Sequence, residues 1–149
     1  MTPREKLITA AFIFGVIAAG SLIGASFTPG EWYRSLVRPS WTPPNWVFGP
    51  VWTVLYGMIG FVGARKWLRG GAWSLWLIQL AVNLSWSPIF FGLNLPATAF
   101  VVIALTTGLV AAFILREWPK DRLSAAMMLP YLVWLIYAST VNAGVVWLN

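Results

Sequence analysis

The stretch LITAAFIFGVIAAGSLIGASF, residues 7–27, decides the class of fold because it carries no charged residue over a length that crosses a membrane. A spanning α-helix needs about 20 mostly apolar residues, at a rise of about 1.5 Å each. A signal peptide also has basic residues before its apolar segment, as Arg4 and Lys6 are placed here, but its apolar segment is shorter. We therefore expect residues 7–27 to form a transmembrane helix.

Four further uncharged windows follow along the chain of 149 residues. Charged residues make up only 9% of the chain, against about 25% in a soluble domain, and they are confined to short patches before and between the windows. The sequence therefore predicts an all-α membrane protein, a single domain of residues 1–149 built as a bundle of five transmembrane helices. The expected spans are residues 7–27, 46–64, 72–93, 95–115 and 123–148.

The basic residues are distributed unequally between the two sides of the predicted bundle. If successive helices alternate in direction, eight of the ten Lys and Arg side chains share the side of the N-terminus, and only Arg34 and Arg38 lie on the other. Short cytoplasmic loops are enriched in Lys and Arg. We expect a cytoplasmic N-terminus and an outward C-terminus, and this topology explains the net charge of +6 without nucleic-acid binding.

Several kinds of chemistry are excluded by residues that the chain lacks. It contains no Cys and no His, which excludes disulfides, thiol nucleophiles, the usual zinc sites and His or Cys ligation of haem. Its four acidic residues all flank the windows, so no intramembrane carboxylate is available for ion coupling or acid–base catalysis. We expect no metal site, no obligatory cofactor and none of the common enzyme mechanisms.

The longest connection, TPGEWYRSLVRPSWTPPN at residues 28–45, contains four of the ten prolines. Proline fixes φ and resists helix formation, so we expect a stiff loop. Its Trp32, Tyr33 and Trp41 suit anchoring at the membrane interface, and they equally suit a cover that folds over the bundle. The pattern leaves both interpretations open.

Aromatic and amide side chains recur at helical spacing in three of the expected helices. The three stripes are Phe48, Trp52 and Tyr56; Gln79, Asn83 and Trp86; and Tyr131, Trp134, Ala138 and Asn142. Amides in hydrocarbon need hydrogen-bond partners, so the stripes should face inward. They can enclose an apolar ligand cavity with a few polar groups, or they can simply join the helices by packing, and spacing alone favours packing.

Small residues recur at a spacing of four in the expected first, second and fourth helices. The pairs and triplets are Gly15 with Ala19, Gly20 with Gly24, Gly60 with Ala64, and Ala104 with Gly108 and Ala112. Such faces let helix backbones approach closely, either inside one bundle or between two copies. We expect a homodimer, and the sequence does not say which face forms its seam.

Three motif blocks give this sequence a resemblance to a known family. They are WTPPNWVFGPVWTVLY at residues 41–56, NLSWSPIFFG at 83–92, and PYLVW at 130–134 continuing to Asn142 and the pair Leu148-Asn149. Together they resemble the translocator protein family, which includes the bacterial tryptophan-rich sensory proteins and the mitochondrial peripheral benzodiazepine receptor. The resemblance covers essentially the whole chain, and the lack of a C-terminal extension is typical of bacterial members. It therefore implies a location in the bacterial cell membrane.

This resemblance implies a homodimeric five-helix bundle with a pocket under the first loop. The family's ligands are porphyrins and other tetrapyrroles, aromatic drug-like molecules and, in animals, cholesterol. The resemblance places Trp52 and Asn83 at ligand contacts and Trp134 and Ala138 on the pocket wall, while Phe48, Tyr56, Gln79 and Trp86 share the same helix faces. No basic residue follows Tyr131 or Tyr137, as the proposed cholesterol motif requires, so cholesterol is not an expected ligand.

Two classes of function are compatible with these features. In the first, the protein binds porphyrins for tetrapyrrole transport, sensing or regulation, with aromatic walls on the ring faces and Arg34 or Arg38 near the propionates. In the second, it is an enzyme that degrades porphyrin in light, with Trp52 and Trp134 supplying electrons. Since the usual axial ligands for iron are absent, metal-free porphyrin is at least as suitable a ligand as haem. A regulatory scaffold without transport is a third possibility that the sequence does not separate from transport.

Overall fold

The computed structural model describes all of residues 1–149 and is 83% helical with no strands. Along the chain its elements are α1 (Pro3–Ser26), α2 (Glu31–Ser35), α3 (Asn45–Arg69), α4 (Trp73–Ser87), the π-helix η1 (Pro88–Gly92), α5 (Pro96–Glu117) and α6 (Arg122–Leu148). Five segments are long and apolar enough to cross a membrane: α1, α3, α4 continued by η1, α5 and α6. The predicted all-α class and the five spanning helices are confirmed.

Local chemistry explains where the helices begin and end. α1 begins with a capping box, in which the Glu5 backbone N–H donates to Thr2 Oγ1 and the Thr2 backbone N–H donates to the Glu5 carboxylate. α3 continues to Arg69, past the predicted end at residue 64, because the basic residues of its last turns have acidic partners inside the protein. It stops at Gly70, whose φ of 78° is accessible to glycine at little cost.

Two short elements were not predicted from the sequence. The proline-rich loop contains the helix α2 in its only long stretch without proline, between Pro29 and Pro39. At the end of α4, Pro88 lacks a backbone N–H, and the helix widens into η1, where the Leu93 N–H donates to the Pro88 carbonyl at 2.9 Å. This wider turn changes the direction in which the aromatic residues after Pro88 point.

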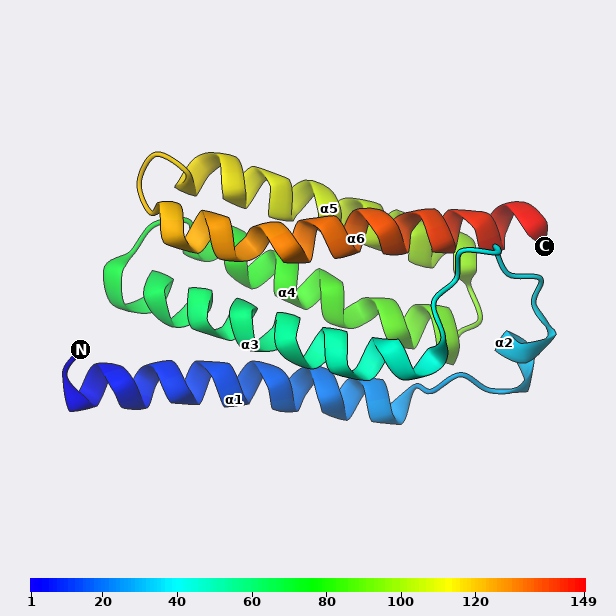
Figure 1. Ribbon diagram of the computed structural model, residues 1–149, viewed down its shortest axis with the longest axis horizontal. Helices are drawn as coiled ribbons and strands as arrows, with labels where there is room; N and C mark the ends of the chain where they lie inside the picture. Colours follow the sequence, from blue (N-terminus) through cyan, green and yellow to red (C-terminus); the bar gives the residue numbers. More distant parts are fainter.

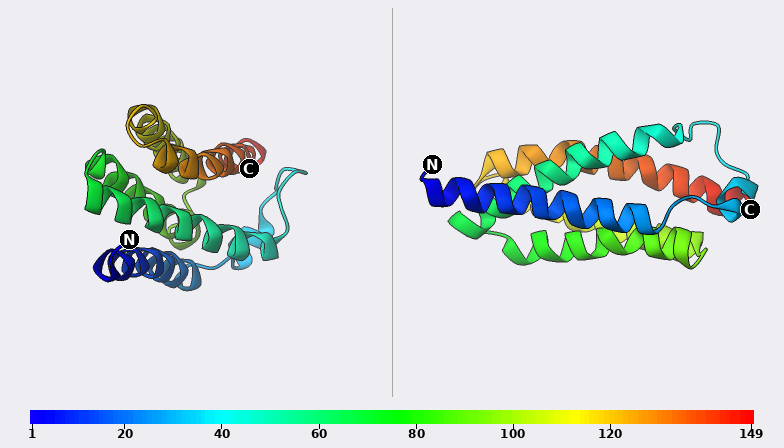
Figure 2. Two further views of the ribbon diagram at one scale, coloured as in Figure 1. Left: turned by 60° about the vertical axis from the view of Figure 1, so that its left-hand side comes forward. Right: turned by 90° about the horizontal axis from the view of Figure 1, so that it is seen from below.

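The spanning helices lie side by side, with the two chain termini at opposite ends of the bundle (Figure 1). α1 packs on α3, α3 contacts α6, α6 packs on α5, and α5 packs on α4. α4 also contacts α3 and α1, but less extensively. Figure 2 shows the same order from two other directions. We call the end that holds the N-terminus and residues 70–72 and 118–121 the basic end. The opposite end is the strap end, after residues 28–44, which we call the strap.

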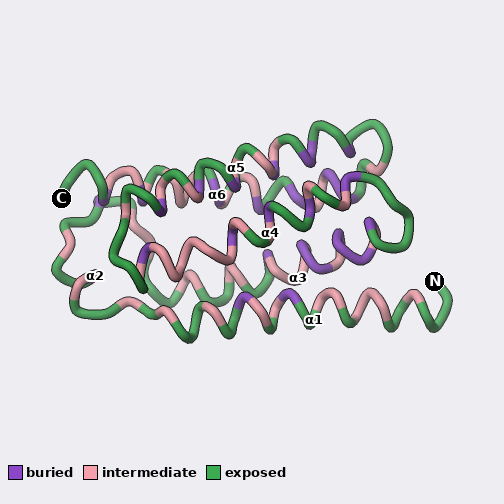
Figure 3. Tube along the Cα trace, turned by 180° about the vertical axis from the view of Figure 1, so that it is seen from behind, coloured by how far each residue is buried: buried purple, intermediate pink, exposed green.

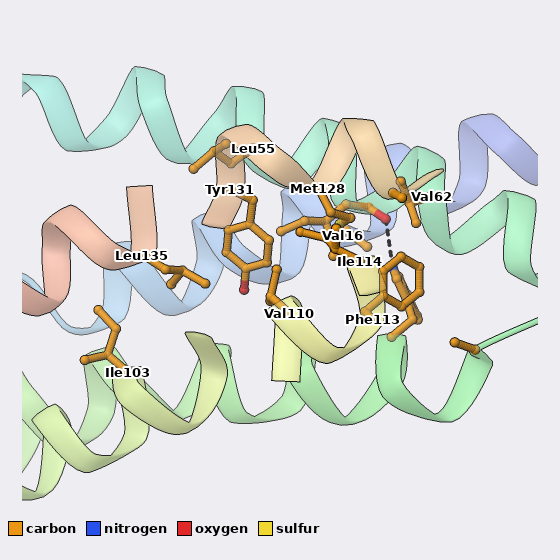
Figure 4. Close-up of a cluster of buried hydrophobic side chains, with 14 residues drawn as sticks. Val16, Leu55, Val62, Ile103, Val110, Phe113, Ile114, Met128, Tyr131 and Leu135 are labelled. Carbon is orange, nitrogen blue, oxygen red and sulfur yellow. Dashed lines mark hydrogen bonds between the residues drawn. The ribbon is translucent and has the colours of Figure 1, made fainter. Parts of the chain in front are cut away.

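The tightly packed core lies toward the basic end. Fourteen buried residues from all five spanning segments and the turn before α4 form one cluster there, and Figure 4 shows the ring of Tyr131 beside Val110, with Leu55 of α3 nearby. Every buried residue of α3 lies at or after Leu55, and Figure 3 shows the first half of α3 without buried positions. The half of α3 nearest the strap is therefore free to border a cavity.

Candidate ligand-binding cavity

A cavity of about 600 Å³ occupies the strap end of the bundle. Its walls come from α1, α3, α4 with η1, α5 and α6, and strap residues including Tyr33 and Arg34 also line it. Ligand pockets for small molecules are typically about 300–1,000 Å³ and mostly apolar. The cavity has this character, and its aromatic lining residues are Phe27, Tyr33, Phe48, Trp52, Tyr56, Trp86, Phe90, Phe91, Trp134 and Tyr137.

One wall is an aromatic surface shared by α3 and α6. The Trp52 ring stacks on Tyr56 with centroids 5.2 Å apart, and it lies perpendicular to the Trp134 ring with centroids 6.4 Å apart. The ring of Phe48 also meets Trp134 in a T-shaped contact, at 6.0 Å. Residues at i, i+4 and i+8 of one helix lie along one face, and here that face meets a tryptophan one helix away. Each ring holds its neighbours in place.

The opposite wall is formed by the end of α4 and by η1. Trp86 stacks on Phe90 at 4.7 Å, and the widened turn of η1 brings Phe90 to only 2% exposure. The Trp86 indole N–H donates to Asn142 Oδ1 at 3.0 Å, while Asn142 Nδ2 donates to the Pro96 carbonyl at 2.9 Å. Asn142 therefore joins α4, α5 and α6 beside the cavity.

Hydrogen bonds between amides and tyrosines close the cavity toward the core. Tyr56 Oη donates to Asn83 Oδ1 at 3.2 Å, and Asn83 Nδ2 donates to the hydroxyl oxygen of Tyr131. Tyr131 in turn donates to Gln79 Oε1 at 2.9 Å. Gln79 is fully buried and does not line the cavity, in contrast to its predicted position on the wall. Its role in the structure is to support Tyr131.

Trp134 carries a polar group that has no partner within the protein. Its Nε1 is buried and makes no hydrogen bond, although the side chain lies on the cavity wall. Buried indole N–H groups are normally paired, because an unmade hydrogen bond costs free energy. The cavity wall therefore includes one buried donor that the protein itself does not satisfy.

The two arginines of the strap have different surroundings. Arg34 lines the cavity and has no carboxylate partner in the protein. The guanidinium carbon of Arg38 instead lies 4.8 Å from the centroid of the Tyr33 ring, and the residue borders a small outer groove with Pro39 and Thr42. Of the two arginines predicted at the mouth, only Arg34 borders the cavity.

Eight of the ten predicted site residues therefore meet around one cavity. They are Arg34, Phe48, Trp52, Tyr56, Asn83, Trp86, Trp134 and Ala138, whereas Arg38 and Gln79 lie outside it. Sequence reasoning missed the contribution of α1, where Gly20 and Gly24 line the cavity. A Cβ at Gly20 would lie 2.2 Å from the Tyr56 ring, so the glycine leaves room for that ring. The small-residue spacing marked these positions, but only as packing residues.

A second polar cluster, at the basic end, was also not predicted. Lys66 Nζ lies 2.6 Å from Glu117 Oε2 and 3.0 Å from Asp121 Oδ2, and Arg65 pairs with Asp121 at 2.7 Å. Lys66 and Glu117 are almost completely buried, and Glu117 also accepts the Ala72 backbone N–H at 2.7 Å. The cluster ties together the ends of α3 and α5 and the starts of α4 and α6, far from the cavity.

The fold and the cavity together define a polytopic membrane protein with an internal, aromatic-walled cavity covered by a strap. The model of the TspO/MBR family matches residues 10–148, and the chain belongs to this family. It is 38% identical to protein CrtK of Rhodobacter capsulatus over 146 residues, which cover 93% of this chain and 91% of the relative. Identity to the human translocator protein is 37%, covering 83% of this chain and 79% of the relative. The tryptophan-rich protein TspO of Chlorobaculum tepidum is 34% identical over 98% of this chain and 99% of its own.

Proposed function

We propose that this membrane protein binds porphyrins and similar flat aromatic molecules in the cavity at the strap end, and that it acts in tetrapyrrole transport, sensing or regulation. The observation that carries the proposal is a cavity of about 600 Å³ with aromatic walls and an unpaired, buried N–H of Trp134. Aromatic faces suit a flat π-system, and the unpaired donor suits an acceptor atom on its edge.

The charge near the cavity supports a ligand that carries carboxylates. Arg34 is exposed, has no acidic partner and borders the cavity. A guanidinium binds a carboxylate through two parallel hydrogen bonds, which is the recognition that a porphyrin propionate needs. Arg38 is less suited to this role because it already lies over the Tyr33 ring.

A titration of the purified protein with metal-free protoporphyrin in the dark tests this function. We expect saturable binding with quenching of tryptophan fluorescence. Trp134→Phe keeps an aromatic ring but removes the N–H, and it should weaken binding about three- to tenfold, as expected for one hydrogen bond. Trp147→Phe is the matched control, since Trp147 is 89% exposed. Absence of saturable binding by the wild type would refute the proposal.

Light-dependent porphyrin degradation is a second candidate, favoured by one geometric feature. Trp52 and Trp134 lie on the same cavity wall with their rings 6.4 Å apart, and Trp52 also stacks on Tyr56. An excited porphyrin bound there would take one electron from an indole ring, and the porphyrin radical anion would add dissolved oxygen. The oxygenated porphyrin radical would then return the electron to the indole radical cation, so that oxygen is the net oxidant and the source of the added oxygen atoms.

Product analysis after illumination separates the two candidates. Degradation requires a covalently altered tetrapyrrole that appears in light and oxygen, and that is lost in Trp52→Phe while dark binding persists. Unchanged porphyrin after illumination of the saturated wild type would leave binding as the function and exclude the enzyme.

A further inference from the structure

The bundle consists of two parts that share one buried core toward the basic end and enclose the cavity toward the strap end. α1 packs closely on α3, and α5 packs closely on both α4 and α6, whereas the two groups contact each other less extensively. The cavity is lined by α1 and α3 on one side and by α4, η1, α5 and α6 on the other. How the two parts are joined therefore decides how a molecule can enter or leave.

At the basic end, the two parts are joined by buried polar contacts. Lys66 of α3 pairs with Glu117 of α5 at 2.6 Å, and the Trp76 indole N–H of α4 donates to the Ile59 carbonyl of α3 at 2.9 Å. Separating a buried ion pair leaves unpaired charge inside the protein, which is strongly unfavourable. The basic end is thus the firmly joined end.

At the strap end, the strap passes over the space between the two parts of the bundle and contacts α6. Val37 and Asn149 exchange two hydrogen bonds, from the Val37 N–H to Asn149 Oδ1 at 3.0 Å and from Asn149 Nδ2 to the Val37 carbonyl at 2.7 Å. Pro39 is buried against Gly144, where even a Cβ would lie 2.1 Å from Pro39 Cγ. Gly144 therefore leaves the room that the Pro39 ring occupies, which a residue with a side chain would block.

The two hydrogen bonds between Val37 and Asn149 are of the kind that open at low cost. Val37 is 56% exposed and Asn149 is also exposed, so water can replace their hydrogen bonds. The same strap carries Tyr33 and Arg34 to the cavity wall. Displacing the strap from α6 would uncover the cavity and move both residues, while the buried contacts at the basic end stay intact.

We propose that Val37 and Pro39 of the strap, with Asn149 and Gly144 of α6 and its cap, form a latch that closes the cavity and must release for a ligand to exchange. These four are positioning residues, since none of them is needed to touch the ligand. The proposal rests on the proposed binding of porphyrin for its ligand, and the latch itself can be measured without porphyrin.

A reversible cross-link tests the latch directly. An ideal Cβ at Gly144 lies 3.2 Å from the Pro39 Cβ, close to the separation of about 3.5–4.5 Å in disulfides, and the chain has no cysteine of its own. In Pro39→Cys/Gly144→Cys, oxidation before adding protoporphyrin should slow association at least about tenfold, and oxidation after loading should slow release equally, since tenfold corresponds to about 1.4 kcal/mol. Reductant should reverse both effects. Equal exchange rates in the oxidised and reduced forms would overturn the latch.

Removing the hydrogen bonds tests the same latch without a cross-link. Asn149→Ala should raise both the association and the dissociation rate of protoporphyrin about tenfold while Kd changes much less, because two exposed hydrogen bonds to the strap are lost. Ser35→Ala is the matched control, since the Ser35 hydroxyl bonds only to the Trp32 carbonyl within the strap. Weaker binding without faster association would show that Asn149 is merely structural.

A cysteine on the cavity wall provides the readout that needs no porphyrin. Ala138→Cys places a thiol in the cavity, and its reaction with a maleimide reports how often the cavity opens. Adding Asn149→Ala should speed this reaction about tenfold, by the same loss of hydrogen bonds. An unchanged reaction rate would refute the latch even if the protein binds porphyrin, and a faster rate would support it even if porphyrin does not bind.

Discussion

Trp52 has three aromatic neighbours, as many as Trp134 of the same wall. Its ring contacts Tyr56 at 5.2 Å, Tyr131 at 6.2 Å and Trp134 at 6.4 Å. The residue is half-buried and lines the cavity. Its ring can therefore contact a ligand and keep its neighbours in position at the same time.

Trp52→Ala should weaken porphyrin binding about tenfold or more. An aromatic contact is worth about 0.5–1.5 kcal/mol beyond its area, and burial of a large side chain adds about 1.5–3 kcal/mol, against ~1.4 kcal/mol for a factor of ten. Titration of the folded variant, with helix content checked by circular dichroism, measures the loss. Binding as tight as that of the wild type would assign the aromatic wall to packing alone.

Asp121 makes the basic end sensitive to acid. Burial raises the pKa of its carboxyl, but hydrogen bonds from Arg65, Ser124 and Lys66 outweigh burial and hold the pKa well below its usual range. The folded protein therefore binds this proton more weakly than the unfolded chain does. The resulting stabilisation is complete above the ordinary Asp pKa of about 3.9 and is lost as the pH falls from there toward the depressed value.

The thermal midpoint of the protein in detergent should accordingly decrease as the pH falls below about 4. Asp121→Asn should lower the midpoint at pH 7 and make it less dependent on pH in the acid range. If wild type and variant lose stability in parallel down to pH 3, the carboxyl of Asp121 is not the group responsible.

At the scale of the helices, the small-residue faces have two different roles. Gly60 of α3 lies against the backbone of α1, where a Cβ would be 2.6 Å from the Ile13 Cα and 2.7 Å from the Phe12 carbonyl oxygen. On α5, the face formed by Ala104, Gly108 and Ala112 points out of the bundle, and nothing lies within 4 Å of a Cβ at Gly108. The structure thus shows that the small-residue face of α3 is internal and that of α5 is free. The sequence spacing, which is the same in both helices, did not distinguish them.

The two glycines should respond differently to the same substitution. Gly60→Leu must push α1 and α3 apart at backbone atoms, so we expect a loss of about 1–3 kcal/mol in stability, as for other overpacked sites. Gly108→Leu should leave the stability of the monomer nearly unchanged. Thermal unfolding of both variants in detergent measures the contrast, and equal losses would contradict the internal position of Gly60.

The free face of α5 is one candidate seam for the predicted homodimer. If two copies meet there, Gly108→Leu should shift the protein from dimer to monomer, because the larger side chain blocks close approach of the backbones. Native mass measurement of the solubilised protein reports the change. A dimer that persists in Gly108→Leu would place the seam on another helix.

At the scale of the whole molecule, the charges predict how the bundle sits in its membrane. Arg65 and Lys66 are paired with acidic residues, but six other basic residues at the basic end remain exposed: Arg4, Lys6, Arg69, Arg116, Lys120 and Arg122. The strap end has only Arg34 and Arg38. This difference still favours a basic end in the cytoplasm after internal pairing is taken into account.

We therefore expect the N-terminus to lie inside the cell and the C-terminus outside, with the strap over the outer face. Fusions of a reporter that is active only outside should work at the C-terminus and fail at the N-terminus. Reversing the bias, by adding several lysines to the strap while neutralising Arg116, Lys120 and Arg122, should give a mixed orientation. A cytoplasmic C-terminus in the wild type would refute the predicted orientation.

The sequence by itself determined the membrane class, the five spans and the faces that turn inward. These features follow from local patterns: uncharged windows of spanning length, and aromatic or amide residues at helical spacing. Most of the candidate site could be predicted for the same reason, since Trp52, Asn83, Trp134 and Ala138 each lie on an inward face of one helix. Family resemblance then placed those faces around a single pocket.

Only the tertiary structure decided how residues distant in sequence pair with one another. It placed Arg34 on the cavity wall, with Arg38 and Gln79 outside it. It also showed that Lys66 pairs with Glu117, 51 positions away, and that Val37 bonds to Asn149, 112 positions away. Helical periodicity gives the direction of a side chain around its own axis, but not the neighbour that it meets there. That neighbour depends on the order, depth and tilt of the packed helices, and on the path of the strap above them.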